Sequence, residues 1–171
     1  MNDMRPQTGE FAPYYQKYID LVKGQSVNEA IQQYAQPLKS FYNSLSEEKA
    51  NYAYAEGKWS VKELLQHVID TERVFSYRAM CISRNDQNAF PGFDENTYVL
   101  ASKSKFRTLT DLQIEFSAVR HCTNLLFQSF DDEQLACKGT ANNVPVTVNA
   151  IGFILFGHLL HHKKILEERY L

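Results

Sequence analysis

Apolar residues recur at helical spacing in four segments of the 171-residue chain, and a polar start signal precedes each segment. Positions three and four residues apart share one face of an α-helix, so this period predicts amphipathic helices rather than strands. The predicted helices cover about residues 27–43, 61–84, 111–130 and 148–169. Ser26 and Ser60 are each followed three residues later by a glutamate, which predicts capping boxes for the first two helices. Thr110 and Thr147 are the expected N-caps of the other two.

Four helices in one chain of this length predict an all-α fold, a four-helix bundle. The connection from Asn85 to Thr110, between the second and third helices, is long enough to cross over along the bundle. The other connections are shorter, which predicts an up-down-down-up order with the second and fourth helices antiparallel. Residues 1–171 are expected to form a single domain, with residues 1–25 as an N-terminal extension packing on the bundle. Pro37 predicts a kink, and residues 137–149 predict a small hairpin or irregular loop.

Three histidines fall at one depth in this bundle. His158 and His162 are four residues apart, so they lie one above the other on one helical face. At about 1.5 Å per residue, His67 lies about 10 Å from the start of its helix, and His158 and His162 lie about 10–17 Å from the end of theirs. These depths match if the two helices are antiparallel. Three imidazoles at one level predict a metal site that keeps open positions for water or substrate, as catalytic sites do.

The remaining histidines are predicted to lie outside this site. His161 falls well round the last helix from the apolar face, and His121 lies opposite the apolar stripe of the third helix. The alternative to ligation stays open for the three inward histidines as well, because a single buried histidine is more often a hydrogen-bonded core residue.

Other candidate site residues lie near the predicted metal end. Glu63 is one turn before His67 and would suit a general base, although it also completes the Ser60 capping box. Asp70, three residues after His67, would orient its second nitrogen or be a solvated surface charge. Three aromatic residues in the preceding connection are pocket-lining candidates, with ordinary core packing as the alternative: Tyr52, Tyr54 and Trp59.

Composition excludes several classes of protein. The net charge is −2, the pI is about 6.2 and no basic block is present, so no nucleic-acid partner is expected. The three cysteines show no Cys-x-x-Cys spacing, which is typical of reduced thiols in a cytoplasmic protein. No apolar stretch approaches the roughly 18 residues of a membrane span, and residues 1–15 hold no apolar signal core, so no membrane partner is expected.

Three runs carry a resemblance to a known family: KWSVKELLQHVIDTERVFSYRA (58–79), FPGFDENTYV (90–99) and GHLLHHKKILEERYL (157–171). Together they resemble the DinB/YfiT-like superfamily of metalloenzymes. The resemblance implies a crossed-over four-helix bundle, often a homodimer, that binds a divalent metal ion such as zinc or nickel. It carries the family's motif histidines onto His67, His158 and His162. Characterised members include transferases and isomerases that use low-molecular-weight thiols, and many others are described as metal-dependent hydrolases.

The function expected from these observations is that of a metal-dependent enzyme acting on a small-molecule substrate. A divalent ion lowers the pKa of water or of a thiol, so the reaction would be hydrolysis or S-transfer. The alternatives are a non-catalytic metal-binding or stress-response protein and a metal-free scaffold. Phe153, Phe156 and Leu160 extend the apolar surface of the last helix, and they predict either a homodimer interface or packing within the chain.

Overall fold

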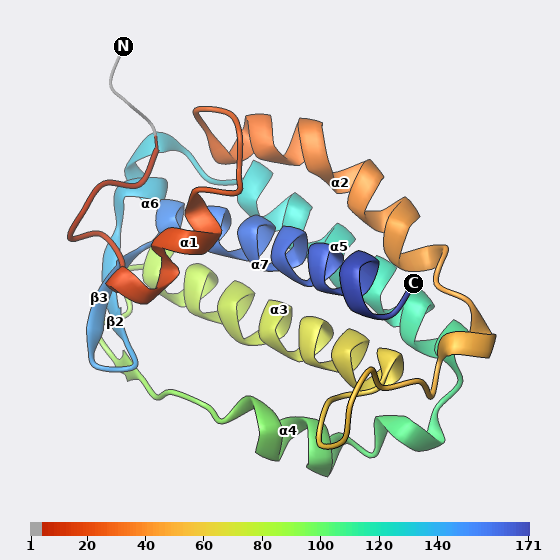
Figure 1. Cartoon of the computed structure of the whole chain (residues 1–171). Helices are drawn as coiled ribbons and strands as arrows, with labels where there is room; N and C mark the ends of the chain where they lie inside the picture. Colours follow the sequence, from red (N-terminus) through yellow and green to blue (C-terminus); the bar gives the residue numbers. More distant parts are fainter. Residues whose placement is uncertain (1–4) are drawn as a thin grey trace.

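Four long helices dominate the computed structural model, which describes residues 5–171 (Figure 1). They are α2 (Val27–Asn43), α3 (Val61–Ser83), α5 (Leu109–Gln128) and α7 (Val148–Arg169). The shorter helices are α1 (Gln16–Ile19), α4 (Glu95–Ser102) and α6 (Asp132–Ala136), and single 3₁₀ turns span Pro13–Tyr15, Glu47–Lys49 and Ser104–Phe106. The strands are β1 (Ala89–Phe90), β2 (Lys138–Ala141) and β3 (Val144–Thr147).

The long helices form a bundle in the predicted order. α2 and α7 run in one direction and α3 and α5 run in the other (Figure 1). α3 packs against α5 and α7, and α2 packs against the same two helices from the opposite side. The crossover between α3 and α5 contains α4, which packs along α3. The up-down-down-up topology is therefore confirmed, and it makes α3 and α7 antiparallel neighbours.

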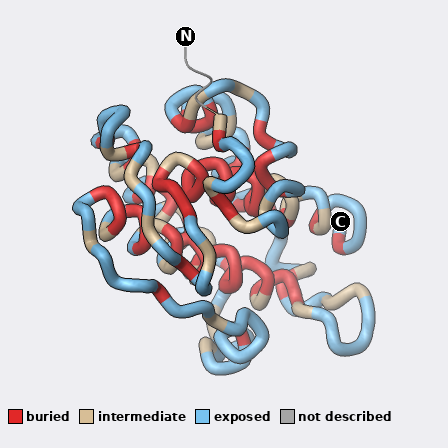
Figure 2. The backbone as a smooth tube through the Cα atoms, turned by 90° about the vertical axis from the view of Figure 1, so that its left-hand side faces the viewer, coloured by how far each residue is buried: buried red, intermediate tan, exposed pale blue. Residues whose placement is uncertain are grey.

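α7 is the central helix of the core, because α1, α2 and α3 all pack against it. Figure 2 shows the buried backbone in the interior and the exposed segments on the outside. Phe153 and Phe156 are at most 1% exposed within the chain itself. The ring of Phe156 contacts the ring of Tyr34 in α2 and the guanidinium of Arg120 in α5. Packing within the chain therefore accounts for these two phenylalanines. Leu160 is partly buried against the same core, and the homodimer stays a prediction.

The local signals account for most of the helix ends. Ser60 forms the full capping box with Glu63, whereas Glu29 bonds the backbone N–H of Gln25 instead of that of Ser26. The expected start of the third helix was wrong by two residues: the Thr108 hydroxyl accepts the Asp111 N–H at 3.1 Å, so α5 begins at Leu109. α5 also ends earlier than expected, at Gln128. Asp131 is then the N-cap of a separate helix, α6, which begins at Asp132.

The predicted hairpin exists and is part of a small sheet. β2 and β3 pair antiparallel around Asn142 and Asn143, which both have positive φ angles (51° and 61°), as the commonest two-residue hairpin turn requires. β1, from the crossover, adds to β2 in parallel register. This third strand ties the crossover to the hairpin, beside the end of α3 (Figure 1).

A glycine in α7 lets the N-terminal segment approach the bundle closely. A Cβ atom at Gly157 would lie 2.1 Å from the backbone oxygen of Tyr18, so only glycine allows this contact. The Arg5 guanidinium donates to the carbonyl oxygens of Ile19, Val22 and Gly24, at the end of the same segment. As a result, α1 packs on α7 at Gly157, next to the first histidine of the motif, His158. Within residues 5–171, no helix is long and apolar enough to cross a membrane.

Candidate metal centre

His67, His158 and His162 point their imidazoles at one spot between α3 and α7. The Nε2 atom of His158 lies 3.0 Å from Nε2 of His67 and 3.0 Å from Nε2 of His162. One nitrogen from each ring falls within 4.8 Å of the other two. With metal–nitrogen bonds of about 2.0–2.1 Å, two ligands of one ion lie about 3 Å apart. The three nitrogens are therefore spaced as the ligands of a single ion are.

Hydrogen bonding alone does not account for this arrangement. An imidazole nitrogen is either a donor or an acceptor, with one proton or one lone pair. Nε2 of His158 has two nitrogen neighbours at 3.0 Å, so it can form only one well-aligned hydrogen bond with them. Nδ1 of His162 is buried and has no hydrogen-bond partner among the described residues. A cation at the centre would use all three lone pairs at once.

Burial keeps these imidazoles neutral, as ligands must be. Each of the three side chains is 8% exposed. Burial lowers the pKa of His67 to about 4, helped by the charge of neighbouring His161. Burial likewise holds the pKa values of His158 and His162 well below the ordinary value, and the repulsion among the histidines adds to this effect. Neutral nitrogen donors in an uncharged cluster suit zinc or nickel, whose bonding to imidazole is strong.

The sequence positions these rings through simple local features. The Ser60 capping box fixes the start of α3, two turns before His67. The spacing of four residues stacks His158 and His162 on the face of α7 that meets α3. Because α3 and α7 are antiparallel, the early part of one helix lies level with the later part of the other, which brings the three histidines together.

The cluster forms part of the wall of a cavity of about 620 Å³. α3, α7, the N-terminal segment, the crossover and the hairpin turn all contribute to its lining. Among residues 5–171, no fourth histidine, cysteine or carboxylate joins the three nitrogens. An ion held there would keep free coordination positions facing the cavity. That is the arrangement of a catalytic rather than a structural metal site.

Two aromatic rings border the cluster, one against His67 and one against His158. Trp59 lies with its ring centroid 4.7 Å from that of His67, and it lines the cavity as the sequence suggested. Tyr18, from the N-terminal segment, has its ring 5.8 Å from His158 and 5.2 Å from His161. Burial raises the pKa of Tyr18, with its hydrogen bond to Tyr14 as a second cause. Tyr18 is thus a neutral hydroxyl near the histidines.

The other aromatic candidates lie farther from the cluster. Tyr54 lines a second, smaller cavity of about 250 Å³ together with Trp59, His162 and Tyr170. Tyr52 lines neither cavity, is 45% exposed and contacts the ring of Tyr170. The hydroxyl of Tyr170 donates a hydrogen bond to the carbonyl oxygen of Trp59 at 2.7 Å, which helps to fix the backbone position of the tryptophan.

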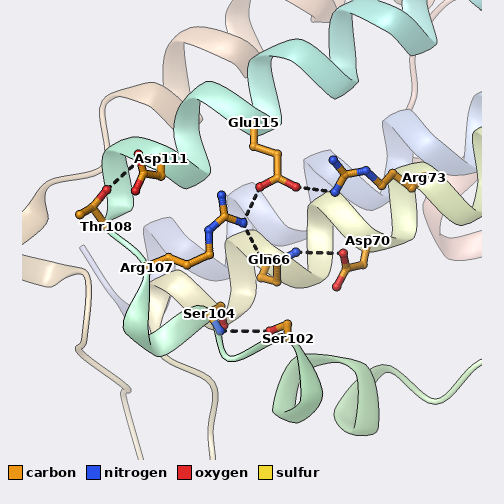
Figure 3. Close-up of polar contacts among 9 residues, drawn as sticks. All are labelled: Gln66, Asp70, Arg73, Ser102, Ser104, Arg107, Thr108, Asp111 and Glu115. Carbon is orange, nitrogen blue, oxygen red and sulfur yellow. Dashed lines mark hydrogen bonds and ion pairs between the residues drawn. The ribbon is translucent and has the colours of Figure 1, made fainter.

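The two carboxylates proposed from the sequence are hydrogen-bonded to other groups and do not join the cluster. Glu63 accepts hydrogen bonds from the backbone N–H and the hydroxyl of Ser60, both at 2.8 Å, so it serves as the helix cap. Asp70 accepts from Gln66 at 2.9 Å on the side of α3 that faces α5 (Figure 3). Arg107 bridges Gln66 and Glu115 in the same polar network (Figure 3). Neither carboxylate lines the large cavity, and Asp70 does not orient His67.

The two histidines predicted to lie outside the site do so in different ways. His121 is exposed on α5. His161 is outside the three-nitrogen cluster, but it lines the cavity and its ring lies 5.1 Å from that of His162. His161 therefore belongs to the cavity wall rather than to the group of potential ligands.

Sequence reasoning missed several residues of the cavity wall. Thr71, Phe75 and Arg78 follow His67 at helical spacing on α3, a periodic signal that was available in the sequence. Tyr18 lies in the four-residue helix α1 and Phe93 in the crossover outside any helix or strand, and both segments are too short to show periodicity. Their positions depend on the docking of those segments, which the sequence pattern does not reveal.

Comparison with known proteins agrees with this architecture. The sequence profile of the DinB superfamily matches residues 28–166. A protein of Oceanobacillus iheyensis with the provisional name of metal-dependent hydrolase OB0413 is 23% identical over 84 residues, which are 49% of each chain. The chain thus spans about half the length of this curated relative.

A solved structure is similar over nearly the whole fold. It is YfiT from Bacillus subtilis, described as a probable metal-dependent hydrolase with an unusual four-helix bundle topology. The TM-score is 0.68 at 16% identity, and the match covers 95% of this chain and 89% of the other. Since the family profile covers most of the sequence and the bundle has the crossed-over order, the chain belongs to the DinB superfamily.

Proposed function

We propose that this protein is a metal-dependent hydrolase whose ion is held by His67, His158 and His162. The observation that carries the proposal is the convergence of three buried, neutral Nε2 atoms on the wall of a cavity. The names of the Oceanobacillus iheyensis relative and of YfiT support the same class of activity. Zinc and nickel are the ions that fit the donor set best.

The ion would supply a nucleophile near neutral pH by lowering the pKa of water or of a thiol. The side chains around the ion would shape the site and exchange protons with the substrate. The aromatic rings of Trp59 and Tyr18 lie against His67 and His158 and give the site apolar walls. The hydroxyl of Tyr18 and the imidazole of His161 line the same cavity, within reach of a bound substrate, and are the groups best placed to exchange a proton with it.

An activity panel on zinc-loaded and nickel-loaded protein tests this function. We expect hydrolysis of some esters or amides, with at least a hundredfold loss in the His158→Gln variant, because that substitution removes the central ligand. His121→Gln is the matched control, since His121 is exposed and does not line the cavity. His161→Gln should lower kcat while metal stoichiometry stays at that of the unaltered protein.

The panel should include conjugation of low-molecular-weight thiols to electrophiles. Metal-dependent conjugation without hydrolysis would replace the hydrolase proposal with a thiol transferase that uses the same ligands. Activity that persists in His158→Gln, or protein that holds its ion yet turns over no substrate class, would contradict a catalytic role for the three-histidine site. The latter result would favour the non-catalytic metal-binding alternative.

A further inference from the structure

The large cavity has a second polar end, about three helical turns along α3 from the histidines. Arg78 follows His67 by eleven residues, which corresponds to about 16 Å of helix. Phe75, Phe93 and the hairpin residues Asn142 and Val144 line the cavity together with Arg78. The cavity is therefore elongated, with possible metal ligands at one end and a guanidinium at the other.

Arg78 is buried without a counter-ion. The residue is 5% exposed, and no carboxylate of residues 5–171 forms an ion pair with it. Its Nη2 atom donates to the carbonyl oxygen of Pro91 at 2.6 Å, while Phe75 and Phe93 cover the guanidinium at 5.0 and 6.0 Å from their ring centroids. A guanidinium has five N–H donors and stays charged, so most of this hydrogen-bonding capacity is unused by the protein.

A buried charge without a partner is costly, and the other buried arginine of the bundle shows the usual solution. Arg120, which is 2% exposed, lies 2.8 Å from a carboxylate oxygen of Glu72. Burial lowers the pKa of Arg78 from its ordinary value, which reflects its poor solvation. An anionic ligand bound in the cavity would therefore supply the counter-ion that Arg78 lacks within the protein.

A second polar group lies between the two ends of the cavity. Thr71 is one turn after His67 on the same face of α3, is 5% exposed and lines the cavity. Its hydroxyl oxygen is buried and has no hydrogen-bond partner among the described residues. The order His67, Thr71, Phe75, Arg78 along one helical face thus gives a potential metal ligand, an unused hydroxyl, an apolar ring and an unpaired cation.

The remaining charges of the cavity are consistent with an anionic ligand. Lys17 and Glu95 also line it, and both are exposed. The ammonium group of Lys17 lies over the rings of Tyr14 and Tyr18, at 4.1 and 5.0 Å from their centroids. Glu95 is the only carboxylate among the lining residues of this cavity. The buried end thus has a single charge, which is positive.

We infer that the substrate is an elongated molecule with an anionic group, such as a carboxylate, that binds Arg78 while its reactive group lies at the three histidines. Thr71 hydrogen-bonds a polar atom in the middle of the molecule. This inference rests on the proposed function, because it assumes that the histidine end is where substrate reacts. It assigns Arg78 and Thr71 as binding residues that determine specificity.

A matched pair of inhibitors tests the inference on zinc-loaded, full-length protein. The probes are ω-carboxyalkyl hydroxamates with linkers of increasing length, and their methyl esters, measured by calorimetry. The hydroxamate binds zinc and the free carboxylate reaches toward Arg78. We expect the acid to bind about 10- to 100-fold more tightly than the ester at one optimal length, as a charge-assisted hydrogen bond provides.

Variants then locate the effect. Arg78→Gln should abolish the preference for the acid, Arg78→Lys should retain part of it, and Thr71→Val should weaken acid and ester alike. Arg84→Gln is the control, because it removes the same charge from the end of the same helix outside the cavity. Equal binding of acid and ester to the unaltered protein, or a preference that survives in Arg78→Gln, would overturn the inference.

A third arm separates this inference from the proposed function. In chelator-treated protein, 4-phenylbutyrate should bind about tenfold more tightly than 4-phenylbutanamide, and nuclear magnetic resonance shifts should be centred on Arg78. Failure of all hydroxamates to bind, together with this carboxylate preference, would reject the metal site and leave the anion site standing. Equal binding of the two phenyl compounds would reject the anion site, whatever the hydroxamates do.

Discussion

α3 contributes to two buried polar clusters through residues only five positions apart, Glu72 and His67. The clusters differ in whether the protein itself satisfies their polar groups. Glu72 reaches α5, where its Oε1 atom lies 2.8 Å from Nη1 of Arg120, and both side chains are 2% exposed. His67 reaches α7 on another face, where its imidazole meets those of His158 and His162 and no carboxylate of the described residues. The charged pair is neutralised by the protein itself. The histidine cluster has unused lone pairs, and it faces a cavity.

This difference separates a structural cluster from a functional one. The Glu72–Arg120 contact is close but lacks hydrogen-bond alignment, and Arg120 also donates to Asn124 and covers the ring of Phe156. Its surroundings are core side chains. The histidine cluster instead borders the space where a small molecule fits. Substitutions in the first cluster should therefore alter stability, and those in the second should alter ligand binding.

The largest expected effect comes from breaking the ion pair. Glu72→Gln or Arg120→Met alone should cost about 3–5 kcal/mol of unfolding free energy, because each leaves one buried charge unpaired. The double variant Glu72→Gln/Arg120→Met should recover part of that loss, measured by urea denaturation. His158→Gln in metal-free protein is the comparison, and we expect it to cost far less. A loss of stability with His158→Gln as large as with Glu72→Gln would remove the distinction between the clusters.

Acid should destabilise the metal-free protein through the histidines. The pKa of folded His67 is lowered to about 4 by burial, against about 6.5 in an unfolded chain. The unfolded state therefore binds more protons between these values, so stability is complete above about pH 6.5 and falls as the pH drops toward 4. His67 alone accounts for about 3 kcal/mol of this loss.

Urea denaturation between pH 7.5 and 4.5 measures the effect. His67→Gln should flatten the pH dependence, whereas the exposed His121→Gln should leave it unchanged. If His67→Gln and the unaltered protein lose stability in parallel, His67 is not a source of the acid sensitivity.

Added metal should stabilise the folded protein at neutral pH, where the imidazoles are free of protons. A ligand at a hundred times its dissociation constant stabilises the folded state by about 2.7 kcal/mol. Zinc or nickel should therefore raise the melting temperature at pH 7.5, and do so much less at pH 5, where protons compete for the imidazoles. Glu72→Gln should show the same metal-dependent increase from a lower starting temperature. Equal stabilisation at both pH values would argue against histidine ligation.

The smallest effect concerns the N-terminal segment above the histidines. Gly157→Ala places a Cβ atom 2.1 Å from the Tyr18 backbone oxygen, so α1 must move, at a cost of about 1–3 kcal/mol. Gly152→Ala is the matched control, because the atoms nearest its Cβ belong to side chains rather than to the backbone: Val27 at 2.7 Å and Phe127 at 3.0 Å. Thermal denaturation should rank Gly157→Ala below Gly152→Ala. The reverse ranking would mean that the α1 contact is not tightly packed.

The sequence predicted the bundle and the level of its histidines because both follow from periodicity and helix length. Four apolar stripes, their N-caps and one long connection were sufficient for the up-down-down-up order. The ranges expected for the first and last helices match α2 and α7. Periodicity also underlies the row from His67 to Arg78, although the stripe alone does not distinguish a cavity wall from a packed core.

Other features depended on tertiary contacts that no local pattern encodes. The positions of Tyr18 and Phe93 follow from the docking of short segments on α7 and α3. The carboxylate of Glu63 was ambiguous, because one residue type serves both as a cap and as a base, and the hydrogen bonds to Ser60 account for it as a cap. The shared burial of Glu72 and Arg120 was likewise invisible, since they are far apart in sequence.

Calorimetric titration of chelator-treated, untagged protein with zinc at pH 7.5 tests the central claim most directly. We expect one ion per chain, held by His67, His158 and His162. Replacing any of these three by glutamine should weaken binding strongly, while His161→Gln and His121→Gln should retain the same stoichiometry. Absence of zinc and nickel binding, or binding that is unchanged in His158→Gln, would contradict it.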